Sequence, residues 1–145
     1  MAKAIPDGYH TVIPYLVVRG AAELIEFMKA AFDAKEWERI MRPDGTVGHA
    51  EMRVGDSVIM LSEARGEWQP MPGAIYLYVP DADAAYQRAI DAGATSISPP
   101  ANQFYGDRHG GVRDASGNLW WIATHIEDVP ADELKQRAEV FFSKH

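Results

Sequence analysis

The chain has 145 residues, of which 47% are apolar and 24% are charged, a composition typical of a globular protein with its own core. Its net charge of -7 and its scattered basic residues argue against a nucleic-acid partner. The absence of cysteine excludes disulfides, thiolate chemistry and cysteine-based zinc sites. No apolar run approaches the roughly 20 residues of a membrane helix, and MAKAIPDGYH lacks the apolar segment of a signal peptide. We therefore expect a cytoplasmic protein with no membrane partner.

The first half of the chain predicts a strand, a helix and three further strands. These elements are expected at 12–18, from Gly20 to Phe32, at 37–41, and in a hairpin of 48–54 and 58–61. Residues 48–54, GHAEMRV, alternate in character, so Ala50, Met52 and Val54 should face a helix-covered core. His49, Glu51 and Arg53 then share the opposite face.

The second half predicts the same order of elements. They are expected as a strand at 74–79, a helix at 81–92 ended by Gly93, a short strand at 95–98, a loop at 102–111, and a hairpin of 112–113 and 119–124. A last amphipathic helix is expected over 128–143, with Asp128 as its cap. An offset of 61 residues aligns Val18 with Val79 and Met60 with Trp121, which indicates an internal repeat.

Three stretches carry a family resemblance: PYLVV with GAAELIEFMKAAF, GHAEMRVGDSVIMLSE, and YGDRHGGVRDASGNLWWIATHIEDV. With the element order, they resemble the vicinal-oxygen-chelate superfamily, and most closely its PhnB-like glyoxalase/bleomycin-resistance branch. The resemblance implies an α+β fold of two βαβββ modules whose curved mixed sheets surround a cavity, plus a C-terminal helix. It implies one domain over 1–145, with modules at about 10–63 and 73–127 and the last helix at about 128–143. It also implies a homodimer.

Metal-dependent members of this superfamily hold a divalent ion through the first and fourth strands of each module. The matching positions here are Ile13, Met60, Ala74 and Trp121. None of these side chains is a suitable ligand for a hard divalent ion. We therefore expect neither the family metal site nor a cofactor.

The same strand faces predict an apolar, aromatic cavity with a few polar groups, the usual profile of a small-molecule site. Ligand contacts are expected from Tyr15, Met60, Tyr76, Tyr78, Tyr105, Arg108 and Trp121. His49 and Glu51 are the candidates for catalysis, since histidine titrates near neutrality and a carboxylate can polarise it.

Each of these assignments has an alternative. Trp121 can be ordinary core, with Trp120 facing the other way, and Tyr76 and Tyr78 can line a dimer interface. His49 and Glu51 can form a solvated polar face or join another histidine in an unrelated metal site. The loop at 102–111 can be a lid or a turn fixed by Asp107 and Arg108.

Two functions follow from these residues. The first is a protein that binds a small planar or cationic molecule in an aromatic cavity without a metal. The second is a metal-independent lyase or isomerase that transfers protons through His49 or Glu51. A metal-dependent glyoxalase or dioxygenase conflicts with the four positions above.

Overall fold

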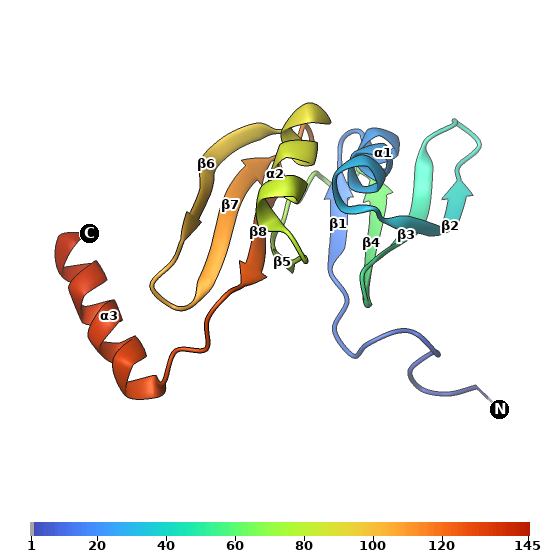
Figure 1. The fold of residues 1–145 in the computed structure, drawn as a ribbon. Coiled ribbons are helices and arrows are strands. Elements are labelled where there is room, and N and C mark those ends of the chain that lie inside the picture. The colour runs from blue at the N-terminus through green and yellow to red at the C-terminus, as the bar shows by residue number, and fades with distance from the viewer. Residues whose placement is uncertain (1) are drawn as a thin grey trace.

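The computed structural model describes residues 2–145 and contains eleven elements. The first module comprises β1 (Tyr15–Val18), α1 (Ala21–Phe32), β2 (Lys35–Met41), β3 (Val47–Val54) and β4 (Ser57–Glu63). The second comprises β5 (Ala74–Tyr78), α2 (Ala82–Asp91), β6 (Thr95–Asn102), β7 (Asp107–Arg113) and β8 (Leu119–His125), and α3 (Ala131–Lys144) follows. Figure 1 shows the two modules side by side, with α1 next to α2.

Each module forms one four-stranded mixed sheet with the same topology. The strand orders are β1-β4-β3-β2 and β5-β8-β7-β6, and the first pair in each order is parallel while the others are antiparallel. The register repeats as well, since Tyr15 lies opposite Met60 and Tyr76 lies opposite Trp121. The predicted fold, two βαβββ modules followed by a C-terminal helix, is thereby confirmed.

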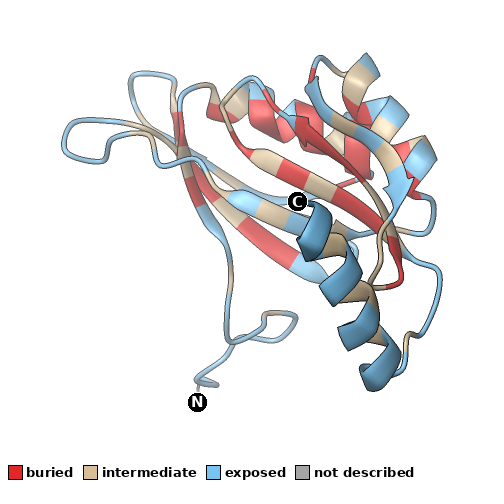
Figure 2. Cartoon of the chain, turned by 90° about the vertical axis from the view of Figure 1, so that its left-hand side faces the viewer, coloured by how far each residue is buried: buried red, intermediate tan, exposed pale blue. Residues whose placement is uncertain are grey.

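The buried side chains of both modules form one hydrophobic cluster where the helices meet the sheets (Figure 2). Ala50, Met52 and Val54 face this core, as the alternation of β3 predicts. Trp120 is fully buried, and its ring packs against Phe32 of α1 at 4.9 Å between centroids. The helices therefore cover one face of each sheet. The opposite face of each sheet carries no helix, and we call it the helix-free face.

The start of α1 is fixed by a strand of the same module. Gly20 precedes the helix with a φ of 85°, a left-handed conformation that favours glycine. The carboxylate of Glu63, at the end of β4, accepts hydrogen bonds from the backbone N–H groups of Gly20 and Ala21. An anion at a helix N-terminus satisfies otherwise unpaired donors, so the Glu63 side chain is committed to the helix.

The structure corrects the prediction for residues 95–111. β6 continues through Pro99 and Pro100 to Asn102, whereas a break was expected before the prolines. It is an edge strand with register shifts between Ser96 and Ala101, where a missing N–H disturbs the ladder least. β7 already begins at Asp107, so the predicted loop shrinks to residues 103–106.

The last helix also begins later than predicted. α3 starts at Ala131 with Pro130 as its N-cap, and Asp128 instead bonds to His125. None of its residues is buried, and it projects away from the body in Figure 1. Its attachments include a bidentate ion pair between Arg137 and Glu127 and the packing of Phe141 on Phe104 at 5.0 Å. Within residues 2–145 we find no helix with the length and apolar character needed to cross a bilayer.

Candidate functional site

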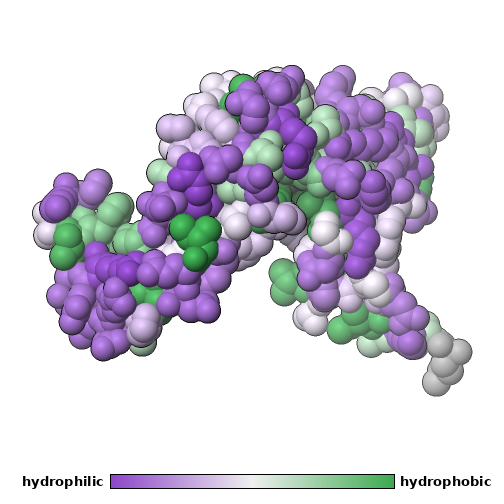
Figure 3. All heavy atoms as spheres, in the orientation of Figure 1, coloured by the Kyte–Doolittle hydropathy of each residue, from purple (hydrophilic) through white to green (hydrophobic). Residues whose placement is uncertain are grey.

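Apart from Arg108, the polar and aromatic residues predicted as a site lie in two separate groups, on or beside the helix-free faces of the two sheets. The first group lies on β1, β3 and β4 and includes Tyr15, His49 and Glu51. The second lies on β5, β7 and β8 and around the turn at 103–106. Figure 3 shows that the molecule is hollowed between α3 and the N-terminal segment.

On the first sheet, Glu51 organises a chain of hydrogen bonds. Its carboxylate is buried and accepts one bond from the Tyr9 hydroxyl and one from Nε2 of His49 at 2.7 Å. Nδ1 of the same ring lies 3.2 Å from the Tyr15 hydroxyl, within hydrogen-bonding distance. The half-exposed Tyr15 is thus the solvent-facing end of a Tyr9–Glu51–His49–Tyr15 chain.

Glu51 remains ionised despite its burial. Burial alone would raise the pKa of Glu51, but the hydrogen bonds from Tyr9 and His49 outweigh it and lower that pKa below its usual value. Met60, the other predicted residue on this sheet, pairs with Glu51 across the β3–β4 ladder. Both line an open cavity of about 430 Å³, whose lining also includes the N-terminal segment around Tyr9.

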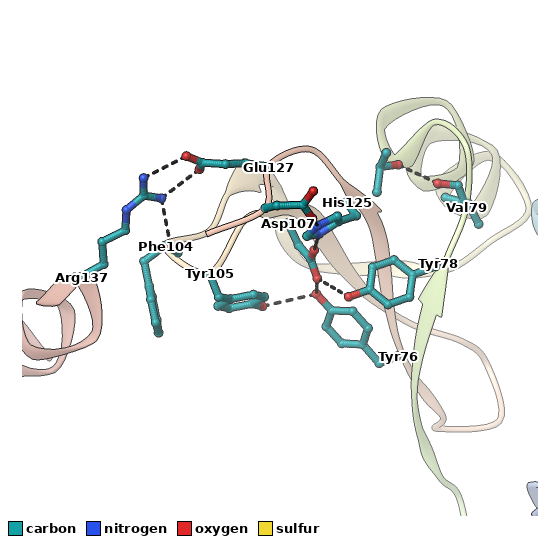
Figure 4. Close-up of polar contacts among 11 residues, drawn as sticks. Tyr76, Tyr78, Val79, Phe104, Tyr105, Asp107, His125, Glu127 and Arg137 are labelled. Carbon is teal, nitrogen blue, oxygen red and sulfur yellow. Dashed lines mark hydrogen bonds and ion pairs between the residues drawn. The ribbon is translucent and has the colours of Figure 1, made fainter. Parts of the chain in front are cut away.

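On the second sheet, Asp107 plays the corresponding organising part (Figure 4). Its carboxylate is buried, and Oδ2 accepts hydrogen bonds from the hydroxyls of Tyr76 at 2.6 Å and Tyr78 at 2.7 Å. Oδ1 accepts from Nδ1 of His125 at 2.8 Å, while Nε2 of His125 donates to Asp128 at 2.7 Å. The Tyr105 hydroxyl lies 3.4 Å from that of Tyr76.

The protonation states follow from these contacts. Burial would raise the pKa of Asp107, but the bonds from Tyr76, His125 and Tyr78 lower it overall. Burial and the bond to Asp107 raise the pKa of Tyr76, and the bond to Asp107 raises that of Tyr78. The bonds to Asp107 and Asp128 raise the pKa of His125. Asp107 is therefore an anion surrounded by neutral phenols and one imidazolium.

Trp121 completes an aromatic cluster, which we define as Tyr76, Tyr78, Tyr105, His109 and Trp121. The Trp121 ring lies 5.2 Å from His109, and His109 lies 5.7 Å from Tyr76. Gly111 makes this arrangement possible, because a Cβ at that position would overlap the Trp121 ring. Burial lowers the pKa of His109, so its imidazole is neutral within the cluster. Trp120 and Trp121 thus serve opposite faces of β8.

The two groups correspond through the repeat. Tyr15 and Tyr76 hold equivalent positions on β1 and β5, and Met60 and Trp121 hold equivalent positions on β4 and β8. His49 and His109 each lie 5.7 Å from the tyrosine of their own module. A tyrosine beside a histidine on the helix-free face is therefore common to both modules.

Arg108 is the predicted contact that the structure removes from this group. It alternates with Asp107 and His109 along β7, so it points to the helix-covered side. There Nε and Nη2 donate to the carboxylate of Asp83 on α2 at 2.8 and 3.0 Å. Asp107 and Arg108 therefore form no pair, and the alternative of a turn held by both is wrong as well.

Sequence reasoning overlooked the acidic centre of the second group. Asp107 falls within the loop expected at 102–111, and His125 falls just beyond the strand expected at 119–124. Both are symmetric about the hairpin turn near Ser116, and the β7–β8 register pairs them directly. Extending that hairpin register would have found the contact. Tyr9 had no such signal, because it precedes β1 and reaches Glu51 only through the path of the N-terminal segment.

The residues at the family's metal positions do not fit a metal. Ile13 and Met60 line one cavity beside Glu51, while Ala74 and Trp121 lie on the second sheet. Of the four, only the thioether has a lone pair to offer, and thioethers suit soft metals. Across residues 2–145 no group of three or more His, Asp or Glu side chains is arranged to hold an ion.

These features define an α+β protein with paired βαβββ modules and aromatic helix-free sheet faces. The family model described as the Glyoxalase/Bleomycin resistance protein/Dioxygenase superfamily matches residues 9–122, and the chain belongs to this family. Two mycobacterial proteins, Mb0911c of Mycobacterium bovis and Rv0887c of Mycobacterium tuberculosis, are each 37% identical to it over 133 residues. The alignments cover 84% of this chain and 88% and 78% of those proteins, respectively.

Solved structures share the fold at lower identity. TioX from Micromonospora sp. ML1 has a TM-score of 0.69 and 21% identity, with 81% of this chain and 99% of that chain covered. A glyoxalase/bleomycin resistance protein/dioxygenase family enzyme from Burkholderia phytofirmans PsJN has a TM-score of 0.65 and 20% identity, with 79% and 97% covered. At these identities the likeness shows a shared architecture and does not identify a ligand.

Proposed function

We propose that the protein binds a small planar organic molecule, neutral or cationic, on the aromatic cluster of the second sheet. The observation that carries this proposal is that the buried carboxylate of Asp107 holds the hydroxyls of Tyr76 and Tyr78. These two tyrosine residues are 41% and 61% exposed, so their rings are fixed and still accessible. Fixed rings lose little conformational freedom when a ligand stacks on them. The anion beneath the rings also favours a cationic ligand electrostatically.

The test is quenching of tryptophan fluorescence by a planar cationic dye, acridine orange, and by a neutral planar compound, acridone. Trp121→Ala should weaken dye binding by about 2- to 30-fold, as expected for loss of ~0.5–2 kcal/mol of stacking or cation–π attraction. Trp37→Phe on the first sheet is the matched control and should bind as the wild type does. Equal binding by wild type and Trp121→Ala would remove this cluster as the site.

We also propose that two copies of the chain associate. Support comes from the exposed apolar side chains on the helix-free faces and from α3, where Val140 and Phe142 are 57% and 67% exposed. Contiguous exposed apolar surface is a common mark of an interface. Sedimentation should give a dimer for the full chain and a smaller species after removal of residues 130–145. A full-length monomer at micromolar concentration would contradict the pairing.

The enzyme alternative rests on the Tyr9–Glu51–His49–Tyr15 chain. An ionised carboxylate that orients an imidazole, which in turn contacts an exposed hydroxyl, is an arrangement suited to proton transfer. A lyase or isomerase of this kind would exchange protons next to a carbonyl with solvent. Mass spectrometry of small carbonyl compounds incubated in D₂O would detect that exchange, and His49→Gln should abolish it.

Assignment to the PhnB-like branch belongs with these proposals. It is supported by the sequence stretches GHAEMRVGDSVIMLSE and YGDRHGGVRDASGNLWWIATHIEDV, which coincide with the β3–β4 and β7–β8 hairpins.

A further inference from the structure

Arg42 lies directly after β2 of the first sheet, at the end of the β2–β3 hairpin that is nearest the hairpin turn. Its side chain crosses that end of the hairpin. The ladder shifts register between Ile40 and Met41, which leaves Gly48 as an extra residue on β3. A Cβ at Gly48 would lie 3.2 Å from Cγ of Arg42. The arginine can therefore run past β3 toward β4 because a bulge and a glycine coincide there.

The guanidinium of Arg42 is bonded to neutral oxygens. Nη1 donates to Oγ1 of Thr46 at 3.2 Å, and Nη2 donates to the backbone carbonyl of Glu63 at 3.1 Å. The Glu63 carboxylate itself is occupied by the N-terminus of α1. Arginine has five donors in a planar fork, so several donors remain for a ligand.

Three other arginines pair with carboxylates, whereas Arg42 resembles Arg53, Arg88 and Arg113 in donating to neutral oxygens. Arg39, Arg108 and Arg137 each contact a carboxylate at 2.7–2.9 Å. Arg42 has no carboxylate within ion-pair distance in the part of the chain from residue 2 to residue 145. The pKa of Asp44 is lowered mainly by hydrogen bonds from Thr46 and in smaller part by the charges of Arg65 and Arg42, so Asp44 acts on Arg42 at a distance without touching it. A partly buried guanidinium with no carboxylate in direct contact keeps donors free to recognise an anion, and a carboxylate matches its fork.

A cavity of about 280 Å³ adjoins this cation. Its lining consists of Tyr15, Val17, Arg42, Gly48, Ser62 and Trp68. Trp68 is 66% exposed and is held in a short loop by reciprocal backbone hydrogen bonds with Arg65 at 2.9 Å. The volume is at the small end of ligand pockets, which favours a molecule with a single ring.

We propose that this cavity binds a small aromatic carboxylate, with the carboxylate on Arg42 and the ring against Tyr15 and Trp68. The site lies on the first sheet and does not rest on ligand binding by the aromatic cluster of the second. In this site the ring of the ligand lies beside Tyr15, which is the exposed end of the hydrogen-bonded series Tyr9–Glu51–His49–Tyr15. The chain's net charge of -7 disfavours diffuse anion binding, so affinity for a carboxylate requires a local site.

The experiment uses the full-length protein and the probes benzoate and benzamide, which have the same shape and differ in charge. Two-dimensional NMR of the four indole N–H groups reports where each probe binds, with single Trp→Phe variants for assignment. Benzoate should shift the Trp68 signal saturably, and benzamide should bind at least tenfold more weakly. Arg42→Gln should weaken benzoate binding at least tenfold, and Arg42→Lys should show a partial loss because the charge remains without the fork.

Arg113→Gln is the matched control, because it removes the same charge from an exposed position on β7 and should leave benzoate binding unchanged. Equal affinity for benzoate and benzamide would overturn the proposal even if Arg42→Gln failed to fold. It would also be overturned by unchanged benzoate binding in a folded Arg42→Gln, by a shift at Trp121 instead of Trp68, or by no saturable binding at millimolar probe. Trp121 does not line this cavity, so Trp121→Ala should leave benzoate binding unchanged. The dye-binding test of the aromatic cluster can therefore fail without affecting the benzoate test.

Discussion

Asp107 and His125 lie directly opposite one another in the β7–β8 ladder, and the carboxylate of Asp107 accepts a hydrogen bond from Nδ1 of His125 at 2.8 Å. The other ring nitrogen donates to Asp128, so both nitrogens act as donors and the ring is an imidazolium. This one cation links the buried anion under the tyrosines to the segment that leads to α3. The contact therefore has consequences for pH dependence and for stability.

Stability should fall as pH rises through the neutral range, and His125 should be a cause. Its pKa in the folded protein is raised by Asp107 and Asp128, so its stabilising effect is complete below its ordinary pKa of about 6.5. The effect is lost as pH rises through the higher folded-state pKa. Urea denaturation of wild type and His125→Gln should differ most below about pH 6 and converge at alkaline pH. A His125 Cε1–H titration midpoint below the ordinary value would contradict this.

The two carboxylates that hold His125 should differ greatly in their effect on folding. Asp107 is buried and accepts three hydrogen bonds, and its replacement by alanine leaves two phenols and an imidazolium without their acceptor. We expect Asp107→Ala to lower the free energy of unfolding by about 2–4 kcal/mol. Asp128→Ala removes a fully exposed carboxylate from the same histidine and should change stability little. Similar losses in the two variants would mean that Asp107 is not the organising group.

The adjacent tryptophans should separate stability from binding. Trp120 is fully buried against α1 and donates its indole N–H to Asp114 at 2.8 Å, so Trp120→Phe creates a void and leaves a buried acceptor without one donor. A loss of about 2–4 kcal/mol is expected. Trp121→Phe should cost under about 1 kcal/mol, because its ring lies on the helix-free face. Denaturation curves of the two variants measure the difference, and equal losses would place both rings in the core.

Neighbouring glycines offer a matched pair of substitutions. In Gly111→Ala the new methyl group meets the Trp121 ring, whereas in Gly110→Ala it meets Tyr86 at 2.8 Å and Pro100 on the other face. Both substitutions overpack their sites and should cost about 1–3 kcal/mol. Only Gly111→Ala should displace the Trp121 indole signal in NMR spectra. A shift of that signal in Gly110→Ala as well would indicate that the two faces are coupled.

The alternation in β3 shows how much a local pattern determines. GHAEMRV places Ala50 and Met52 toward the core and His49 and Glu51 on the opposite face, because side chains alternate along a strand. The same rule separates Trp120 from Trp121. The alternation rule does not say where a strand ends, and the end of β6 was predicted wrongly. Pro99 and Pro100 indicated the end of the strand, but β6 is an edge strand and tolerates them.

Sequence by itself determined the order of elements, the repeat, the core faces and the unsuitability of Ile13, Met60, Ala74 and Trp121 as metal ligands, because these depend on residue type and short-range periodicity. Tertiary structure alone decided which distant side chains meet. The path of the N-terminal segment brings Tyr9 to Glu51, and a bulge at Gly48 lets Arg42 reach β4. Such contacts depend on register and chain path, which no local pattern encodes.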